Sequence, residues 1–119
     1  MKKLILFLLL PNLSFAYSKI DCSVVERYND QRIESVFSVA IDESAVAVKV
    51  VAGQKDANLR FVTYYSKDQD LFGARIVDDN LGVTAGNFIE PSKEKTLVKV
   101  RYIKTKPESQ LFALDCVMK

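Results

Sequence analysis

The chain contains no histidine and no tryptophan, and its 119 residues include only two cysteines, three prolines and four glycines. Without histidine it lacks the general base of Ser-His-Asp and Cys-His catalysis and the commonest zinc ligand. A glycine-rich phosphate loop and a dinucleotide-binding fingerprint are also missing. Pairs of carboxylates are the one common catalytic set left open. We therefore expect a protein that is not an enzyme and that holds no metal or cofactor.

The first 16 residues have the three-part layout of a secretory signal peptide. Two lysines precede the apolar run Leu4–Leu10, and Ser14-Phe15-Ala16 has the small residues of a cleavage site. The apolar run is shorter than the about 20 residues that a membrane-spanning helix needs. We therefore expect cleavage after Ala16 and export to the periplasm or out of the cell. The mature protein is then a single β domain, residues 17–119, that does not span the membrane.

Removal of the signal peptide leaves a neutral chain. The whole sequence has 17 Lys+Arg and 15 Asp+Glu, and residues 1–16 hold two of the lysines and no acidic residue, so 15 charges of each sign remain. A neutral domain lacks the basic surface that attracts nucleic acid or anionic lipid. We expect the partner to be another protein or an envelope component.

Cys22 and Cys116 lie near the two ends of the mature chain. In an exported protein an even number of cysteines indicates a disulfide, and the alternative is two buried free thiols. A bridge that closes so long a loop stabilises a fold by ~4 kcal/mol in the chain-entropy model. We expect this bridge to join the first strand to the last.

Alternating apolar and polar residues dominate from Glu34 onward, which is the pattern of half-buried strands. Three hairpins are predicted from it. The first folds residues 37–41 onto residues 46–50 about Glu43-Ser44. The core face of this hairpin then consists of Phe37, Val39, Ile41, Val46, Val48 and Val50.

The second predicted hairpin folds Leu59–Ser66 onto Phe72–Val77, and the third folds Thr96–Lys104 onto Gln110–Met118 through a turn at Pro107. The inward rows are Phe61, Thr63 and Tyr65 with Phe72, Ala74 and Ile76, and Val98, Val100 and Tyr102 with Phe112, Leu114 and Cys116. Lys99 then lies opposite Asp115, an opposite-charge pair that supports the register. Ile20, Cys22 and Val24 share a parity, so the first strand presents Cys22 to the same core.

About seven to eight short antiparallel strands with frequent turn signals predict an all-β fold with one disulfide and little helix. A small sandwich and a small barrel both satisfy this pattern. Residues 24–31 are the one place where we expect a turn of helix. In the irregular segment Asp78–Glu94, residues 83–89 form either a loop or an edge strand.

Two acidic clusters, at residues 68–70 and 78–80, are interpreted as turns. Asp and Asn favour turns because their side chains accept hydrogen bonds from nearby backbone amides. Neither cluster has the ligand spacing of a calcium loop.

The segment KVVAGQKD, Lys49–Asp56, resembles the Q-x-V-x-G hairpin with which cystatins plug the cleft of papain-like proteases. It departs from the cystatin pattern because Lys49 replaces Gln. The long cystatin helix has no counterpart, and the chain has no tryptophan for the second cystatin hairpin. The alternation indicates instead that Val50 is a core residue opposite Phe61 and that residues 53–58 form a polar turn.

Arg60, Val62 and Tyr64 point away from the core on the second hairpin, and Arg75 lies beside them, within reach of Tyr64 for a cation–π contact. Arginine and tyrosine are enriched at binding sites, although an ordinary sheet surface also carries them. We predict a small exported non-catalytic domain that acts as a binding, inhibitor-like or accessory module.

Two alternatives remain. A structural or assembly subunit that works through strand or face association is indicated by apolar residues on the outward side of the last two strands: Leu97, Ile103, Leu111 and Val117. A carboxylate-based enzyme ranks below both binding functions.

Overall fold

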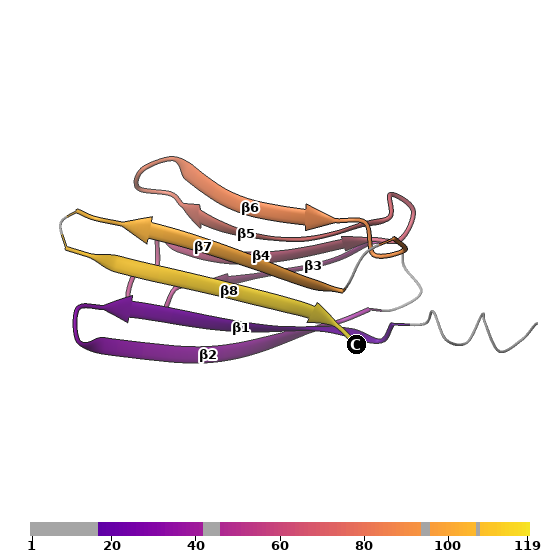
Figure 1. Cartoon of the computed structure of the whole chain (residues 1–119), viewed down its shortest axis with the longest axis horizontal. Helices are drawn as coiled ribbons and strands as arrows, with labels where there is room; N and C mark the ends of the chain where they lie inside the picture. The colour runs from indigo at the N-terminus through magenta and orange to yellow at the C-terminus, as the bar shows by residue number, and fades with distance from the viewer. Residues whose placement is uncertain (1–16, 42–45, 94–95, 107) are drawn as a thin grey trace, which may run out of the picture.

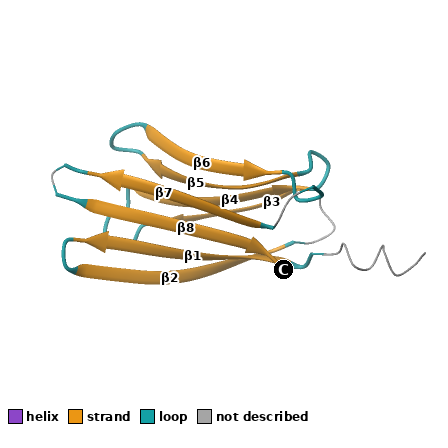
Figure 2. Ribbon diagram, viewed as in Figure 1, coloured by secondary structure: helices purple, strands orange, loops and turns teal. Residues whose placement is uncertain are grey.

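The computed structural model describes residues 17–41, 46–93, 96–106 and 108–119 as a β-sandwich. Two four-stranded antiparallel sheets pack face to face, and the described residues contain no helix (Figure 2). The all-β prediction is confirmed, and the sandwich is favoured over the barrel. The predicted signal peptide and the predicted turn at Pro107 lie outside the described residues, so they stay predictions. Glu43-Ser44 also lie outside the described residues, but the hairpin predicted about them is tested by its two strands below.

Eight strands follow one another along the chain: β1 (Lys19–Tyr28), β2 (Gln31–Ala40), β3 (Val46–Ala52), β4 (Leu59–Ser66), β5 (Leu71–Asp78), β6 (Val83–Ile89), β7 (Leu97–Lys104) and β8 (Gln110–Met118). Sheet A has the order β2-β1-β8-β7 and sheet B the order β3-β4-β5-β6. The chain builds two strands of sheet A, crosses to sheet B for a meander, and returns to sheet A (Figure 1). The end of β8 lies beside the start of β1, where the Lys119 N–H donates to the Lys19 carbonyl at 2.9 Å.

One side-chain row from each of β1, β4, β5, β7 and β8 fills the space between the sheets, because successive residues of a strand point to opposite faces. The buried hydrophobic cluster consists of Ile20, Cys22, Val24, Tyr28, Leu59, Phe61, Tyr65, Phe72, Ala74, Ile76, Val98, Val100, Phe112, Leu114, Cys116 and Met118. Phe112 joins the two layers, since its ring lies 5.7 Å from Tyr28 in its own sheet and 6.5 Å from Phe61 in sheet B, centre to centre.

Cys22 of β1 and Cys116 of β8 form a disulfide between directly opposite residues. Their Cα atoms are 4.1 Å apart, close to the about 4.5 Å of a non-hydrogen-bonded antiparallel pair. Both side chains are buried in the core. The predicted bridge between the first and last strands is confirmed.

Two of the three predicted hairpins are confirmed in register. In β4–β5, Phe61 lies opposite Ile76, Thr63 opposite Ala74 and Tyr65 opposite Phe72. In β7–β8, Val98 lies opposite Cys116, Val100 opposite Leu114, Tyr102 opposite Phe112 and Lys99 opposite Asp115. The ion pair of Asp115, however, is with Arg101 at 2.8 Å. Residues 83–89 form strand β6 at the edge of sheet B.

The predicted pairing of β2 with β3 is wrong, because the two strands belong to different sheets. β2 pairs with β1 and places Phe37 opposite Cys22. The two strands are joined by the two-residue turn Asn29-Asp30, in which Asn29 has a φ of 51°. Asparagine tolerates this left-handed backbone, and tight hairpins favour it. The expected helical turn at residues 24–31 is therefore strand and hairpin turn.

The facing of β3 also differs from the prediction by one residue. Val51, not Val50, lies opposite Phe61, so Val46, Val48 and Val50 face outward and each is 48% exposed. The turn between β3 and β4 sets this register, since the Gly53 N–H donates to the Leu59 carbonyl at 2.6 Å. A shift of one residue exchanges the two faces of a strand.

Replacing both bridge cysteines by alanine should lower the free energy of unfolding by about 4 kcal/mol, because the bridge closes a sequence separation of 94 residues. Urea denaturation of the double variant and the oxidised parent measures the difference. Addition of a thiol reductant should destabilise the parent by the same amount and leave the variant unchanged. A loss below about 1 kcal/mol would contradict this role of the bridge.

Candidate binding surface

The outer side of sheet B forms a surface that we call the sheet B face. Its residues lie in three rows that cross the sheet from β3 to β6: Val48, Tyr64, Gly73 and Phe88; Val50, Val62, Arg75 and Gly86; Ala52, Arg60, Val77 and Thr84. Valine and aromatic side chains dominate the first two rows, and the arginines lie in the second and third.

All four predicted binding residues, Arg60, Val62, Tyr64 and Arg75, lie on the sheet B face. Val62 lies opposite Arg75 in the central row. Arg60 is engaged within the chain, because its Nε and Nη2 donate to the two carboxylate oxygens of Asp79 at 2.7 and 2.9 Å. These bonds raise the pKa of Arg60.

Arg75 lies on this face as an exposed cation. Its guanidinium carbon is 5.0 Å from the centre of the Phe88 ring, and no ion pair to Arg75 occurs among the described residues. The predicted cation–π contact between Arg75 and Tyr64 is wrong, since Phe88 takes that place. The Tyr64 hydroxyl donates instead to Gln69 Oε1 at 2.9 Å.

The sequence analysis did not place Val48, Val50 or Phe88 on this face. Phe88 lies flat against Gly73, where an added Cβ would be 2.1 Å from Phe88 Cδ1. A glycine inside a strand marks a close approach of another group, so Gly73 was the available signal. Val48 and Val50 were missed because they were assigned to the core.

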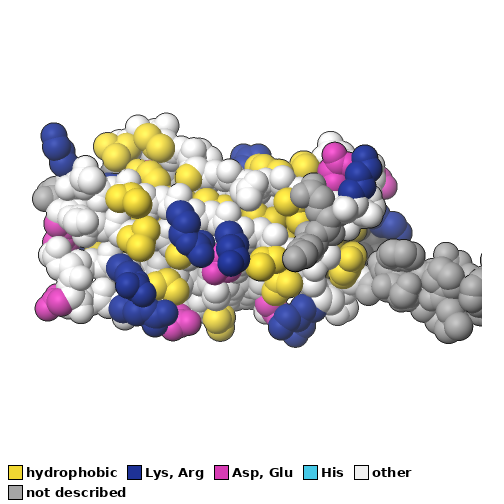
Figure 3. Space-filling view, viewed as in Figure 1, with side chains coloured by type: hydrophobic (Ala, Val, Ile, Leu, Met, Phe, Trp, Pro, Cys, Tyr) yellow, Lys and Arg dark blue, Asp and Glu magenta, His cyan; other side chains and the backbone are white. Residues whose placement is uncertain are grey.

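The outer side of sheet A has a different chemistry. Its ion pairs are Lys19–Asp21, Lys119–Asp21, Arg32–Glu34 and Arg101–Asp115. Figure 3 shows Lys, Arg, Asp and Glu side chains interspersed with hydrophobic ones on the side where sheet A lies nearer the viewer. Leu97 and Ile103 of the edge strand β7 point outward as predicted and are exposed. Their partners on the central strand β8, Val117 and Leu111, are half-buried on the same side.

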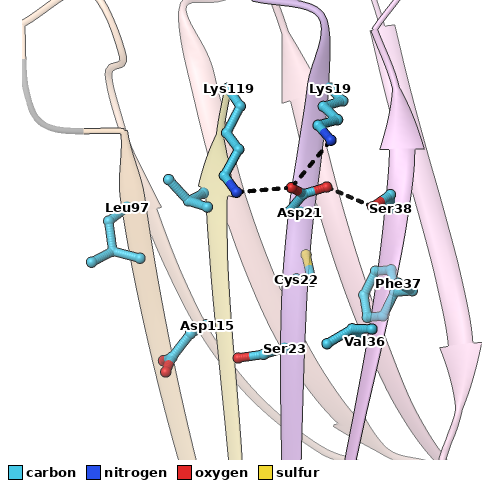
Figure 4. A pocket seen from close by; sticks show the side chains of 11 residues that line it. Lys19, Asp21, Cys22, Ser23, Val36, Phe37, Ser38, Leu97, Asp115 and Lys119 are labelled. Carbon is cyan, nitrogen blue, oxygen red and sulfur yellow. Dashed lines mark hydrogen bonds and ion pairs between the residues drawn. The ribbon is translucent and has the colours of Figure 1, made fainter.

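A depression of about 440 Å³ lies on this outer side of sheet A, between Val36 of β2 and Leu97 of β7 (Figure 4). Asp21 is its central charge. It accepts a hydrogen bond from the Ser38 hydroxyl at 2.5 Å and ion pairs from Lys119 and Lys19 at 3.2 and 3.6 Å. The bond from Ser38 and these lysines hold the pKa of Asp21 below its ordinary value. Its charge is balanced within the chain, so it offers little to a ligand.

A buried cluster around Asp78 joins the two sheets at one end of the sandwich. Asp78 Oδ1 accepts the N–H groups of Asn80 and Leu81 at 3.1 and 3.3 Å, which confirms the turn predicted for residues 78–80. Its Oδ2 accepts from the Tyr102 hydroxyl at 2.9 Å and pairs with Lys104 Nζ at 3.2 Å, both on β7.

The contacts within the Asp78 cluster shift the pKa values of Asp78 and Tyr102. Burial opposes the charge of Asp78, but the bonds from Tyr102, Lys104 and Leu81 outweigh burial, so its pKa lies below the ordinary value. Burial and the bond to Asp78 raise the pKa of Tyr102 to about 12. These shifts favour a carboxylate at Asp78 and a neutral phenol at Tyr102.

Glu26 of β1 is a second fully buried carboxylate. Its Oε1 accepts from the Tyr28 hydroxyl at 2.8 Å, and its Oε2 accepts from the Gln54 N–H at 3.1 Å, which ties the β3–β4 turn to sheet A. The Lys55 ammonium lies 4.1 Å from the centre of the Tyr28 ring. Within the described ranges, no group of three or more Cys, Asp and Glu side chains is placed to hold a metal ion.

No protein-family model, curated protein or solved structure matches this chain. Among the residues that the structure places, there is no helix with the length and apolar character needed to cross a membrane.

In the cystatin-like segment, Val50 is exposed opposite Val62 and does not pack opposite Phe61 as expected. Lys49, the first residue of the segment, lies opposite the buried Thr63, on the side of β3 that faces sheet A.

Asp78→Asn should lower the free energy of unfolding by about 3 kcal/mol at neutral pH, because it leaves Lys104, whose side chain is only 10% exposed, without its closest carboxylate. Asp79→Asn is the matched control, since it breaks the exposed pair with Arg60 and should cost less than about 1 kcal/mol. Chemical denaturation of both variants measures these values. Equal losses would show that the Asp78 cluster does not hold the sheets together.

The same variant gives a pH test. A lowered folded pKa means that Asp78 stabilises the fold fully above its ordinary value of 3.8, and that this stability is lost as the pH falls through the folded pKa. Between about pH 5 and pH 2 the parent should therefore lose more stability than Asp78→Asn. Parallel acid slopes in thermal melts would contradict the assignment.

Proposed function

We propose that the chain is an exported, non-catalytic domain that binds another protein through the sheet B face. The observation that carries the proposal is the contrast between the two outer sides of the sandwich. Sheet A presents single exposed apolar residues interspersed with ion-paired charges of both signs, whereas the sheet B face presents adjacent valines with Tyr64, Phe88 and Arg75, a cation with no ion pair among the described residues. Contiguous exposed apolar groups with aromatic and arginine residues are typical of interaction sites.

The chemistry of the sheet B face selects the kind of partner. Val48, Val50 and Val62 favour an apolar surface, because burial of their side chains removes apolar area from water. Covering Arg75 with an apolar surface alone would leave an unpaired charge out of water, which is costly. The partner is therefore an apolar protein surface that carries a carboxylate opposite Arg75.

Two observations support a location outside the cytoplasm. The first 16 residues have the layout of a signal peptide, and the Cys22–Cys116 bridge is of the kind that persists in oxidising compartments. The domain then acts outside the cytoplasm, as an inhibitor-like or accessory module.

Photo-crosslinking identifies the partner with a built-in control. A photoreactive amino acid is placed at Val62 on the sheet B face or at the exposed Ile103 on sheet A, and the protein is expressed in its own cells. A partner captured from position 62 and not from position 103 is purified, and its affinity for the domain is measured by calorimetry. Equal capture from both positions would count against the sheet B face.

Arg75→Ala and Tyr64→Ala should each weaken binding of that partner by about 30-fold, the size expected of interface hot spots. Ile103→Lys, at an exposed outward position of sheet A, should leave the affinity unchanged. Circular dichroism checks that each variant is folded. If both sheet B variants bind as tightly as the parent, the proposed function is wrong.

A further inference from the structure

β2 leaves one side of its backbone open to solvent. In an antiparallel sheet each residue directs both its N–H and its C=O to one side, and the side alternates along the strand. Since Cys22 and Cys116 form a non-hydrogen-bonded pair, Cys22 exchanges its hydrogen bonds with Phe37 of β2. The Ile41 N–H, of the same parity as Phe37, donates to Ser18 at 2.8 Å. The even-numbered residues 32–40 therefore direct their backbone groups away from the sheet.

The other three edge strands carry features that discourage pairing with another chain. β3 has seven residues and the inward-facing Lys49, and β6 has seven residues with Gly86 at its centre. β7 exposes Lys99 and Arg101 and lies next to β6 (Figure 1). Short edges and charges of this kind are the usual protection against edge-to-edge association.

β2 has fewer of these protections. It runs for ten residues without proline, glycine or lysine, its register with β1 has no bulge, and its two charges, Arg32 and Glu34, pair with each other at 2.7 Å. Val36 is 78% exposed, the highest value among the exposed large hydrophobic residues. On the inner side Ile33, Phe37 and Val39 are only partly buried against the core. The strand thus exposes both backbone groups and apolar side chains on the side where sheet A ends.

We propose that β2 pairs antiparallel with β2 of a second copy of this chain, about a two-fold axis at Val36. The pairs across this axis are Val36 with Val36, Glu34 with Ser38, Arg32 with Ala40, Ile33 with Val39 and Ser35 with Phe37. The two four-stranded sheets A then form one continuous eight-stranded sheet. This dimer uses neither the sheet B face nor any residue of the proposed function.

The strand is complementary to itself in this register. The pairing covers β2 over residues 32–40, and every even-numbered residue in that range meets a partner for its backbone groups. No like charges stand opposite one another, and the partly buried inner row continues into the second copy. A shift that centres the axis on Glu34 would oppose two glutamates and shorten the overlap, which disfavours it.

Sedimentation of the purified protein over a range of concentrations tests the dimer. The parent should show a monomer–dimer equilibrium, and Val36→Lys or Val36→Glu should weaken dimerisation at least about tenfold by opposing like charges at the axis. An equal mixture of the two variants should restore the dimer, because lysine then meets glutamate. Val50→Lys, an exposed valine on β3, should dimerise like the parent.

Amide hydrogen exchange gives a second readout that reports the backbone. On dimerisation the amides of Val36 and Ser38 should become protected, while those of Phe37 and Val39 are protected at every concentration. The proposal is overturned if the parent sediments as a monomer at every soluble concentration. It is equally overturned if Val36→Lys leaves a dimer intact, or if the even-numbered amides stay unprotected in the dimer.

Discussion

The bridge between Cys22 and Cys116 is the constraint on which the arrangement of strands depends. It holds β1 beside β8, so the first and last strands form the middle of sheet A. The tight turn at Asn29-Asp30 then puts β2 on the remaining side of β1 and makes it an edge strand. The same bridge fixes the parity of β1 and β8, and with it the inward position of Phe112, whose ring reaches Phe61 across the sandwich.

Elements in which alternation and a short turn agree were predictable from sequence. The β4–β5 and β7–β8 hairpins belong to this class. The bridge was predictable for another reason: the chain has two cysteines, and alternation places both of them on inward rows. The pairing of β2 was not predictable in this way, because its alternation fits either neighbour along the chain. The tight turn at Asn29-Asp30 decides that β2 pairs with β1 and not with β3. This turn was not predicted, because residues 24–31 were expected to contain a turn of helix.

The face that β3 turns to solvent differs by one residue from the prediction, and this difference changes the candidate site. Its sequence, VAVKVVA, is apolar on both sides, so alternation alone does not tell core from surface. The register with β4 does, because Phe61 and Tyr65 face inward and their partners Val51 and Ala47 must follow. Val48 and Val50 thereby join the predicted Arg60, Val62, Tyr64 and Arg75 and turn a modest polar patch into a mainly apolar face. Lys49 is left facing the sandwich at an edge, where a charge discourages strand addition.

The facing of β3 is tested most directly by the alkylation rate of a single introduced cysteine at Val50 or at Ala47, with the native bridge intact. If the sheet B face is as described, the thiol at position 50 reacts at the rate of an exposed cysteine and the thiol at position 47 is protected, because Ala47 is buried. Faster reaction at position 47 would mean that β3 presents its valines to the core, and the apolar sheet B face would not exist.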